Sequence, residues 1–460
     1  MKNLHFLLIT CSAQGHINPT LQLAKRLLCS GAAKVTFATT VHGLSKMKTL
    51  PSHDGLSYAS FSDGFDDGTK PNDDPHHRMS EFKRVGSQTL THLIQNLSKE
   101  GHPVDFLVYG LILPWVAEVA RDMSIPSALL CSQSASAFAI YHHFFNTHQG
   151  IYNNNNNTPP SFVNLPGLLL FAQEDLPSFL LPNSPHASII PCFREHFQNL
   201  EKDPNPCVLL NTFDALEEEA IKNFGNNINL ISIGPLVPSD NKRAGCDLFE
   251  DSKQYIEWLN NKPDRSVVYV SFGSLAVLQR KQMEEIFHGL VSTGIPFLWV
   301  IRSLEDDDEF KEMIISELDG DNNNNNNNKQ RLIVPWCSQV EVLSHQSVGC
   351  FVTHCGWNST LESLVAGMPV VGCPQFSDQL MNAKMVEDLW GTGIQARVNH
   401  EEEEEGIVKR EEIKRCVEIV IGLDGEKGEE IRKNAAKWRG LSLEASSDVN
   451  LRAFMEKLGA

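Results

Sequence analysis

The sequence predicts an α/β protein built from two doubly wound, Rossmann-like domains that face a cleft. The chain has 460 residues, which is too long for one hydrophobic core, and its 41% hydrophobic and 21% charged content is typical of globular proteins. Short apolar runs alternate with helical patterns in two separate series. A polar stretch, residues 238–254, separates the two series and is typical of an interdomain linker.

The first series predicts a parallel sheet in an N-terminal domain, residues 1–237, with both faces covered by helices. Helical patterns lie between the apolar runs, for example at 19–28 and 79–97. The expected strands are 6–10, 35–39, 106–109, 127–130, 208–211 and 230–233.

The second series predicts a similar C-terminal domain, residues 255–440. Charged helical patterns at 409–458 close the chain. The expected strands are 267–271, 297–301, 349–353 and 369–372.

Composition excludes several classes of partner. The net charge of −18 argues against binding to nucleic acids or anionic membranes. No apolar stretch approaches the ~18 residues that a spanning helix needs. The eleven cysteines lack CxxC spacing, which favours reduced thiols and a cytoplasmic location over disulfides or a zinc site.

Four low-complexity runs interrupt the two series. Two asparagine tracts, 153–157 and 322–328, are expected to be exposed loops. The acidic runs 305–309 and 401–405 are interpreted as solvated loops, because they lack the apolar setting of a metal site. No metal ligand is therefore predicted.

The chemistry concentrates between residues 336 and 379. A buried strand at 349–353 leads through His354-Cys-Gly-Trp-Asn358 into a helical pattern at 359–366. A glycine-containing turn from a parallel strand into a helix points unpaired N–H groups outward, and such a turn binds phosphate well. The next strand, 369–372, leads into a loop that ends in Asp378-Gln379. Open α/β sheets bind ligands at such strand ends.

This stretch resembles, nearly position for position, the signature box of plant UDP-dependent glycosyltransferases that modify small metabolites. The resemblance implies the GT-B fold and UDP-glucose as co-substrate, with no further cofactor. It also implies that Trp336 stacks on uracil, that the backbone of Cys337 pairs with the base edge, and that Gln339 and Glu362 hold the ribose hydroxyls. For the diphosphate, the matched residues are Ser274, His354, Asn358 and Ser359; for the sugar, they are Trp357, Asp378 and Gln379.

Each residue also has a structural interpretation. Ser359 and Glu362 fit the S/T-x-x-E capping box, so Glu362 could bond back to the start of its helix. Trp336 could be a core aromatic residue, and His354 a loop histidine with satisfied hydrogen bonds. Taken together and in this order, the residues favour the nucleotide-sugar site.

A second chemical site is expected after the first strand, in Gln14-Gly-His-Ile-Asn-Pro19. Asn18 suits the N-cap of a helix and Pro19 its first position, which would leave His16 in a loop. An imidazole can take a proton from an attacking hydroxyl, although a loop histidine often only pairs with backbone. The resemblance favours the catalytic role, because family members carry their base in a G-H-x-x-P setting.

Gly110 departs from the family pattern. Members usually pair this histidine with an aspartate at the end of the strand before a P-W-x-x-x-x-A segment, and here Gly110 takes its place. Asp105, at the opposite end of that strand, and Glu118, on the next helix, are poor substitutes. An unassisted His16 is expected to keep a pKa near ~6.5.

We therefore expect an inverting, metal-independent UDP-glucosyltransferase acting on a hydroxyl or carboxyl group of a small plant metabolite, such as a flavonoid, another phenol or a carboxylic acid. The nearest branch contains anthocyanin 5-O-glucosyltransferases and enzymes that form glucose esters. The alternative is a catalytically impaired nucleotide-sugar or small-molecule binding protein. A nicotinamide-dependent oxidoreductase is disfavoured, because no strand-GxGxxG-helix unit begins the chain. The protein is expected to be a monomer, with residues 441–460 forming a helix that returns to the N-terminal domain, as in the family.

Overall fold

The two predicted series form two separate parallel sheets, each in its own compact unit. A computed structural model describes residues 4–47, 50–70, 74–146, 161–225, 227–238, 254–302, 307–319, 330–398, 406–422, 425–445 and 447–459. The first unit comprises Met1–Leu248 with Glu444–Ala460, and the second comprises Phe249–Leu443. Most of the expected linker, both asparagine tracts, the run 401–405 and the first part of the run 305–309 lie outside the described residues.

The sheet of the first unit has the order β3-β2-β1-β4-β5-β8-β9, and every described pair of neighbours is parallel. All strands predicted for this domain are confirmed. The additional strand β3 lies at the edge and is only partly buried, so it lacks the apolar run that marks a central strand. The bounds are β1 His5–Ile9, β2 Lys34–Thr40, β3 Leu56–Phe61, β4 Phe106–Gly110, β5 Ser127–Cys131, β8 Cys207–Leu210 and β9 Asn229–Ser232, with a small antiparallel pair of β6 Phe162–Val163 and β7 Phe171–Ala172.

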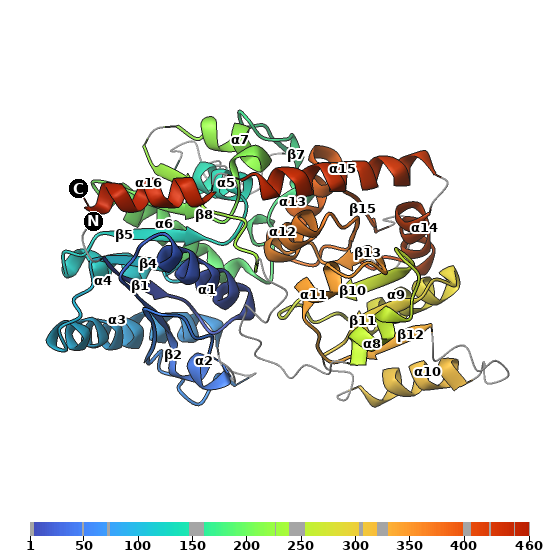
Figure 1. Cartoon of the computed structure of the whole chain (residues 1–460), viewed down its shortest axis with the longest axis horizontal. Helices are drawn as coiled ribbons and strands as arrows, with labels where there is room; N and C mark the ends of the chain where they lie inside the picture. The colour runs from blue at the N-terminus through green and yellow to red at the C-terminus, as the bar shows by residue number, and fades with distance from the viewer. Residues whose placement is uncertain are drawn as a thin grey trace. The chain divides into compact units, whose positions relative to one another are not determined.

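Helices separate these strands along the chain (Figure 1). They are α1 Gln14–Cys29, α2 Val41–Lys46, α3 Pro75–Lys99, α4 Trp115–Asp122, α5 Ala135–Asn146, α6 Ile190–Lys202, α7 Asp214–Lys222 and α16 Ser447–Gly459. The last helix, α16, packs on this sheet although it is distant in sequence: Phe454 contributes to the same apolar cluster as Phe6 and Val108. Its ring lies 5.3 Å from that of Phe106, edge to face. The Ser447 hydroxyl donates to the carbonyl of Gly234.

The sheet of the second unit has the order β12-β11-β10-β13-β14-β15, again with parallel neighbours throughout its described part. The predicted strands are confirmed, and β12 and β15 are unpredicted edge strands. The strands are β10 Val267–Ser271, β11 Phe297–Val300, β12 Arg331–Val334, β13 Val348–Thr353, β14 Val370–Gly372 and β15 Gly393–Gln395. The helices are α8 Gln254–Asn260, α9 Arg280–Thr293, α10 Asp308–Asp319, α11 Gln339–Leu343, α12 Trp357–Ala366, α13 Gln379–Lys384, the π-helical turn η6 Met385–Leu389, α14 Arg410–Ile421 and α15 Glu426–Leu443.

The strand orders locate one switch point in each sheet. Connections turn in opposite directions on the two sides of the β1/β4 pair in the first unit and of the β10/β13 pair in the second. Ligands of open α/β sheets bind outside the carboxyl ends of the strands at such points. His16 follows β1, and His354 follows β13. Each predicted site therefore lies beside the switch point of its own sheet.

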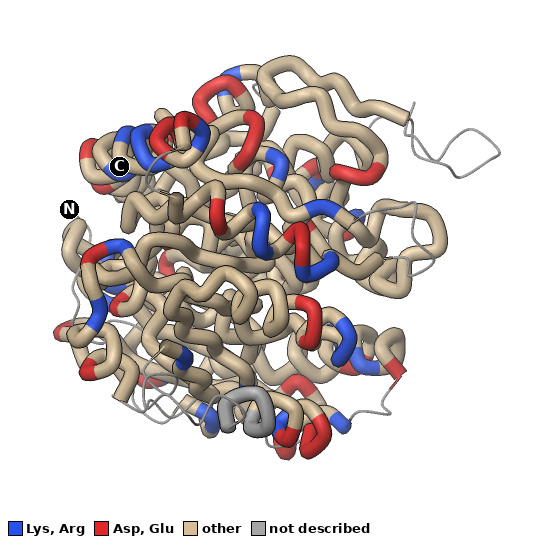
Figure 2. The backbone as a smooth tube through the Cα atoms, turned by 90° about the vertical axis from the view of Figure 1, so that its right-hand side faces the viewer, with Lys and Arg blue, Asp and Glu red and all other residues tan. Residues whose placement is uncertain are grey.

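Figure 2 shows acidic and basic segments at several places along the backbone. The chain carries 57 acidic and 39 basic residues. A bound anion would therefore depend on local groups.

Candidate active site

The turn between β13 and α12 has the geometry of a phosphate-binding turn. Cys355 lies in the left-handed region, with φ +58, and Gly356 is the N-cap of α12. Gly356 has no side chain with which to cap the helix, and its carbonyl accepts the first helical bond, from the N–H of Thr360, at 2.9 Å. Ser359 is the third residue of α12 and not its N-cap, so the capping-box interpretation is wrong. The first N–H groups of α12 face the sheet edge that a ligand would approach.

His354 lies between two glycines. A Cβ atom added to Gly273 would lie 2.8 Å from Nε2 of the His354 ring, and one added to Gly356 would lie 2.5 Å from the same nitrogen. A side chain at either position would displace the His354 ring, and at Gly273 the φ of +72 also favours glycine. The pKa of His354 is lowered to about 4, mainly by burial; a hydrogen bond to the Ser271 backbone opposes this shift, and the positive charge of Arg302 adds to it. The ring is therefore neutral at pH 7.

Gln339 brings together two residues predicted to act on different parts of the donor. Its Nε2 donates to the hydroxyl of Ser359 at 2.9 Å and to Oε2 of Glu362 at 2.6 Å. Its Oε1 accepts from the hydroxyl of Tyr269 at 3.3 Å. That hydroxyl also contacts the Cys337 sulfur at 3.5 Å. Both ends of the Gln339 amide are thus held, and Glu362 is oriented from outside its own helix.

The predicted sugar residues Asp378 and Gln379 are buried at the start of α13. Gln379 Oε1 accepts from the N–H groups of Gln375, at 2.9 Å, and Phe376, at 3.1 Å, which fixes the preceding loop. Asn382 Nδ2 donates to the Asp378 carboxylate at 2.9 Å and to the carbonyl of Cys355 at 3.0 Å. Asn382, which sequence reasoning missed, therefore joins the sugar loop to the phosphate turn. Its spacing of four from Asp378 on a helix was the available signal.

The remaining donor residues differ in exposure. Trp357 is buried, and its ring lies 6.1 Å from that of Trp390, so it also belongs to the core. Trp336, Asn358 and Ser274 are partly exposed. The structure thus places every predicted donor residue in the second unit, on segments that follow β10, β12, β13 and β14 at one edge of its sheet.

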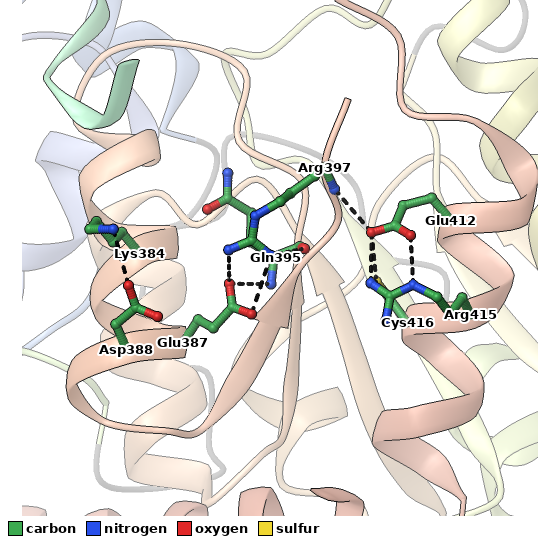
Figure 3. Close-up of polar contacts among 8 residues, drawn as sticks. All are labelled: Lys384, Glu387, Asp388, Gln395, Arg397, Glu412, Arg415 and Cys416. Atoms are coloured by element: carbon green, nitrogen blue, oxygen red, sulfur yellow. Dashed lines mark hydrogen bonds and ion pairs between the residues drawn. The ribbon is translucent and has the colours of Figure 1, made fainter. Parts of the chain in front are cut away.

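A set of ion pairs anchors the segment that follows α13 (Figure 3). Arg397 Nη2 donates to Glu387 at 2.6 Å, and the backbone N–H of Arg397 donates to Glu412 at 3.2 Å. Arg415 donates to the same Glu412 at 2.7 Å. These contacts connect η6, the end of β15 and α14. Because η6 directly follows α13, they hold the C-terminal end of α13 in place.

His16 lies in the first unit, in a setting that differs from the prediction. α1 begins at Gln14, so His16 lies in the first helical turn and not in a loop. Pro19 lies inside the helix, and Asn18 accepts from Gln14 Nε2 at 2.9 Å instead of capping. A proline this close to the start of a helix removes only one backbone hydrogen bond. Nearby, the Thr20 hydroxyl donates to the His16 carbonyl at 2.8 Å.

The electrostatic setting of His16 is apolar. Burial alone lowers its pKa to about 4, so the expectation of a value near ~6.5 was wrong. Asp105 accepts from the N–H of His5 at 2.8 Å, and Glu118 pairs with Lys83 at 3.1 Å. Within the described residues, no carboxylate therefore assists the His16 ring.

Gly110 leaves room where the family's aspartate would stand. It ends β4, and an added Cβ atom would lie 3.8 Å from the Ile9 carbonyl oxygen and 3.9 Å from the Thr10 hydroxyl, both ordinary contacts. That hydroxyl is buried and has no hydrogen-bond partner among the described residues. A Cβ atom at position 110 would thus find space, with the Thr10 hydroxyl beside it as a hydrogen-bond donor.

Three phenylalanines that the sequence offers as possible walls of an acceptor pocket, Phe138, Phe179 and Phe376, pack against other core residues. Phe138 packs on Phe197, with ring centroids 5.3 Å apart, and Phe179 stacks on Phe193 at 4.8 Å. Phe376 is partly buried against the core of the second unit.

The described parts of the chain lack two further features. No group of three or more His, Cys, Asp or Glu side chains is arranged to hold a metal ion. No described helix is both long enough and apolar enough to cross a membrane.

Comparisons with known proteins agree with this arrangement. Residues 238–415 match the family model described as UDP-glucoronosyl and UDP-glucosyl transferase. The phloretin 4'-O-glucosyltransferase of Malus domestica is 48% identical, over 98% of this chain and 97% of that protein. The chloroplastic crocetin glucosyltransferase of Gardenia jasminoides is 49% identical, over 99% of this chain and 97% of that protein. The anthocyanidin 3-O-glucoside 5-O-glucosyltransferase 1 of Perilla frutescens is 44% identical, over 98% of each. The crystal structure of Os79 from O. sativa in complex with UDP matches with a TM-score of 0.84 and 33% identity, over 98% of this chain and 100% of that one.

Two parallel-sheet α/β units that match the Os79 structure over nearly the whole chain place this protein among enzymes of the GT-B fold. This chain belongs to the plant family of UDP-dependent glycosyltransferases that modify small metabolites. The predictions of fold, family and enzyme class are confirmed. The relatives give no support to the alternative of an impaired binding protein.

Proposed function

We propose that this protein transfers glucose from UDP-glucose, with inversion, to a phenolic hydroxyl, as in a flavonoid, or to a carboxyl group of a small plant metabolite. The observation that carries the proposal is the hydrogen-bonded set of Gln339, Ser359 and Glu362 beside the His354 turn. These residues lie together at the carboxyl ends of the strands, where a nucleotide can bind. Relatives named for phloretin, crocetin and anthocyanidin glucosides support this acceptor range.

In the proposed donor site, Trp336 and the Cys337 backbone hold uracil, and Gln339 and Glu362 hold the ribose. The diphosphate lies at the start of α12. Its proposed ligands are Ser274, His354, Asn358 and Ser359, and those of the glucose are Trp357, Asp378 and Gln379. Because the His354 ring is neutral, it contributes a hydrogen bond and no charge.

His16 is the proposed base. It takes the acceptor proton while the acceptor oxygen bonds to the anomeric carbon, and the bond from that carbon to the β-phosphate oxygen breaks, with its electron pair leaving on UDP. A base with a pKa of about 4 is weak. The pKa of a simple phenol is about six units higher than that of His16, so transfer of the phenol proton to His16 is unfavourable. This mismatch favours carboxylic acids and acidified phenols over aliphatic alcohols.

The same proposal includes a monomer in the cytoplasm that needs no cofactor besides its co-substrate. The absence of CxxC spacing in the sequence supports a reducing compartment.

Incubation with UDP-glucose and a mixed panel of phenols and carboxylic acids, analysed by mass spectrometry, tests the function. We expect a mass gain of one hexose on at least one acceptor, together with UDP release. The variant His16→Ala should reduce turnover of hydroxyl acceptors by roughly 10²- to 10⁴-fold and leave UDP binding nearly unchanged. Retention of most phenol activity in His16→Ala would remove His16 from the mechanism, and UDP-glucose binding without any transfer would favour a binding protein.

A further inference from the structure

Arg302 lies two residues beyond the end of β11, at the sheet edge that carries His354. Its Nη1 donates to the carbonyl of Ser274, and its Nη2 donates to the carbonyl of Ala276 at 2.9 Å. Both carbonyls belong to the loop after β10. The guanidinium therefore fixes the loop that presents Ser274.

Arg302 has no acidic partner among the described residues, whereas four other arginines of this unit do. Arg280, Arg397, Arg410 and Arg415 each pair with a glutamate. Burial lowers the pKa of Arg302, and no described carboxylate opposes that effect. A partly desolvated cation is costly unless an anion compensates it. Such a cation is expected where the anion is a ligand.

The donor diphosphate needs a positive charge that the other groups do not supply. The chain has a net charge of −18, and a helix start contributes only about half a charge. His354 is neutral at pH 7, as argued above. The charged side chain whose field acts on His354 is Arg302. The guanidinium is thus close enough to influence whatever binds beside that ring.

We propose that Arg302 is the fixed positive charge of the diphosphate site, acting through the loop 274–276 and by its field. This inference rests on the proposed function. When the bond between the anomeric carbon and the β-phosphate oxygen breaks, its electron pair stays on UDP, so the diphosphate gains negative charge. A fixed cation stabilises this developing charge more than the ground state. Arg302 is thus a positioning residue with an electrostatic role.

Binding of UDP, UMP and uridine by calorimetry separates charge from shape. Arg302→Gln removes the charge but keeps an amide that can donate to a loop carbonyl, whereas Arg302→Lys keeps the charge. Lys427→Gln is the control, since it removes one charge from an exposed ion pair on α15. We expect Arg302→Gln to weaken UDP by about 10- to 100-fold and uridine by less than about 2-fold. Arg302→Lys should keep most of the UDP affinity, and the control should match the wild type.

Two results would overturn the inference: equal weakening of UDP and uridine in Arg302→Gln, which marks a purely structural loop anchor, or unchanged UDP affinity. If Arg302→Gln does not fold by circular dichroism, Arg302→Lys decides. In that case, a UDP affinity within about 5-fold of the wild type, with the same salt dependence, supports the charge, and a larger loss opposes it. Failure of the wild type to bind UDP would instead refute the proposed function, so the two failures remain distinct.

Discussion

Gly110→Asp should convert the unassisted His16 into a histidine with a carboxylate partner. The site accepts the change, because the new Cβ atom meets only contacts of 3.8 and 3.9 Å and the glycine does not require a left-handed backbone. The buried hydroxyl of Thr10 can donate to the new carboxylate. β4 ends beside β1, whose end leads to His16. The backbone and the Cβ position therefore do not oppose the substitution.

The expected magnitude follows from electrostatics. A carboxylate within a few ångströms raises a histidine pKa by about 1 to 3 units, which would move His16 from about 4 towards its ordinary value. A stronger base accelerates proton removal most for the least acidic acceptors, so we expect a gain of roughly 10- to 100-fold for weakly acidic phenols. A carboxylic acid is already ionised at neutral pH, so it gains nothing and is repelled by the new anion.

The assay is kcat/KM for substituted phenols with pKa values from about 7 to about 10, together with substituted benzoates. The gain from Gly110→Asp should grow with phenol pKa. Gly110→Asn, which fills the same space without charge, is the control and should give no such trend. A gain independent of acceptor acidity, or a wild type fastest on aliphatic alcohols, would refute the reasoning, because another group would then have to support His16.

Three other outcomes follow from the structure. UDP-glucose should be preferred over UDP-glucuronate by at least 10²-fold in kcat/KM, because the buried Asp378 carboxylate would repel a second carboxylate on the sugar, and similar values for both donors would contradict this. Asn382→Ala should raise KM for UDP-glucose by about 10-fold with a smaller effect on UDP binding, whereas equal losses for both would indicate general unfolding of the site. His196→Gln should flatten the pH dependence of stability between about pH 4 and 6.5. Burial lowers the pKa of His196 to about 4, so the unfolded chain binds more protons in that window and the wild type loses stability as pH falls, by up to about 3 kcal/mol for this group. Urea unfolding at pH 5 and 7.5 gives the free energy of unfolding of both proteins. An equal change in this free energy between the two pH values, in the wild type and in His196→Gln, would contradict the prediction.

The central strands could be predicted because they are buried on both faces and therefore form continuous apolar runs. Strands β3, β12 and β15 lie at or near sheet edges, where partial exposure mixes polar residues into the run. The start of α1 was misplaced because Asn18-Pro19 resembles a cap, whereas the chain tolerates a proline inside the first turns. Local signals predict helix starts only when the competing starts are energetically distinct.

Contacts from distant segments were outside the reach of sequence patterns. Glu217 accepts from the N–H groups of Ala135 and Ser136, each at 2.9 Å, and so caps α5 from another helix. Asn382 reaches Cys355 from a later helix in the same way. Arg302 gave no signal either, because its partners are backbone carbonyls. Motif spacing predicts the residues that would touch the ligand, and the supporting contacts become visible only in three dimensions.

The histidines of the two proposed sites share one electrostatic property, a pKa lowered by burial. Burial keeps both His16 and His354 unprotonated down to about pH 4, so neither ring changes charge across the physiological range. The acid limb of the activity profile should then follow ionisation of the acceptor and not of the base. A carboxylic acid would be transferred at a nearly constant rate above about pH 5, while a simple phenol would react faster as pH rises towards its own pKa near 10. If His16 is the base, its low pKa and the absence of a carboxylate partner for it among the described residues suit acceptors that arrive already acidic.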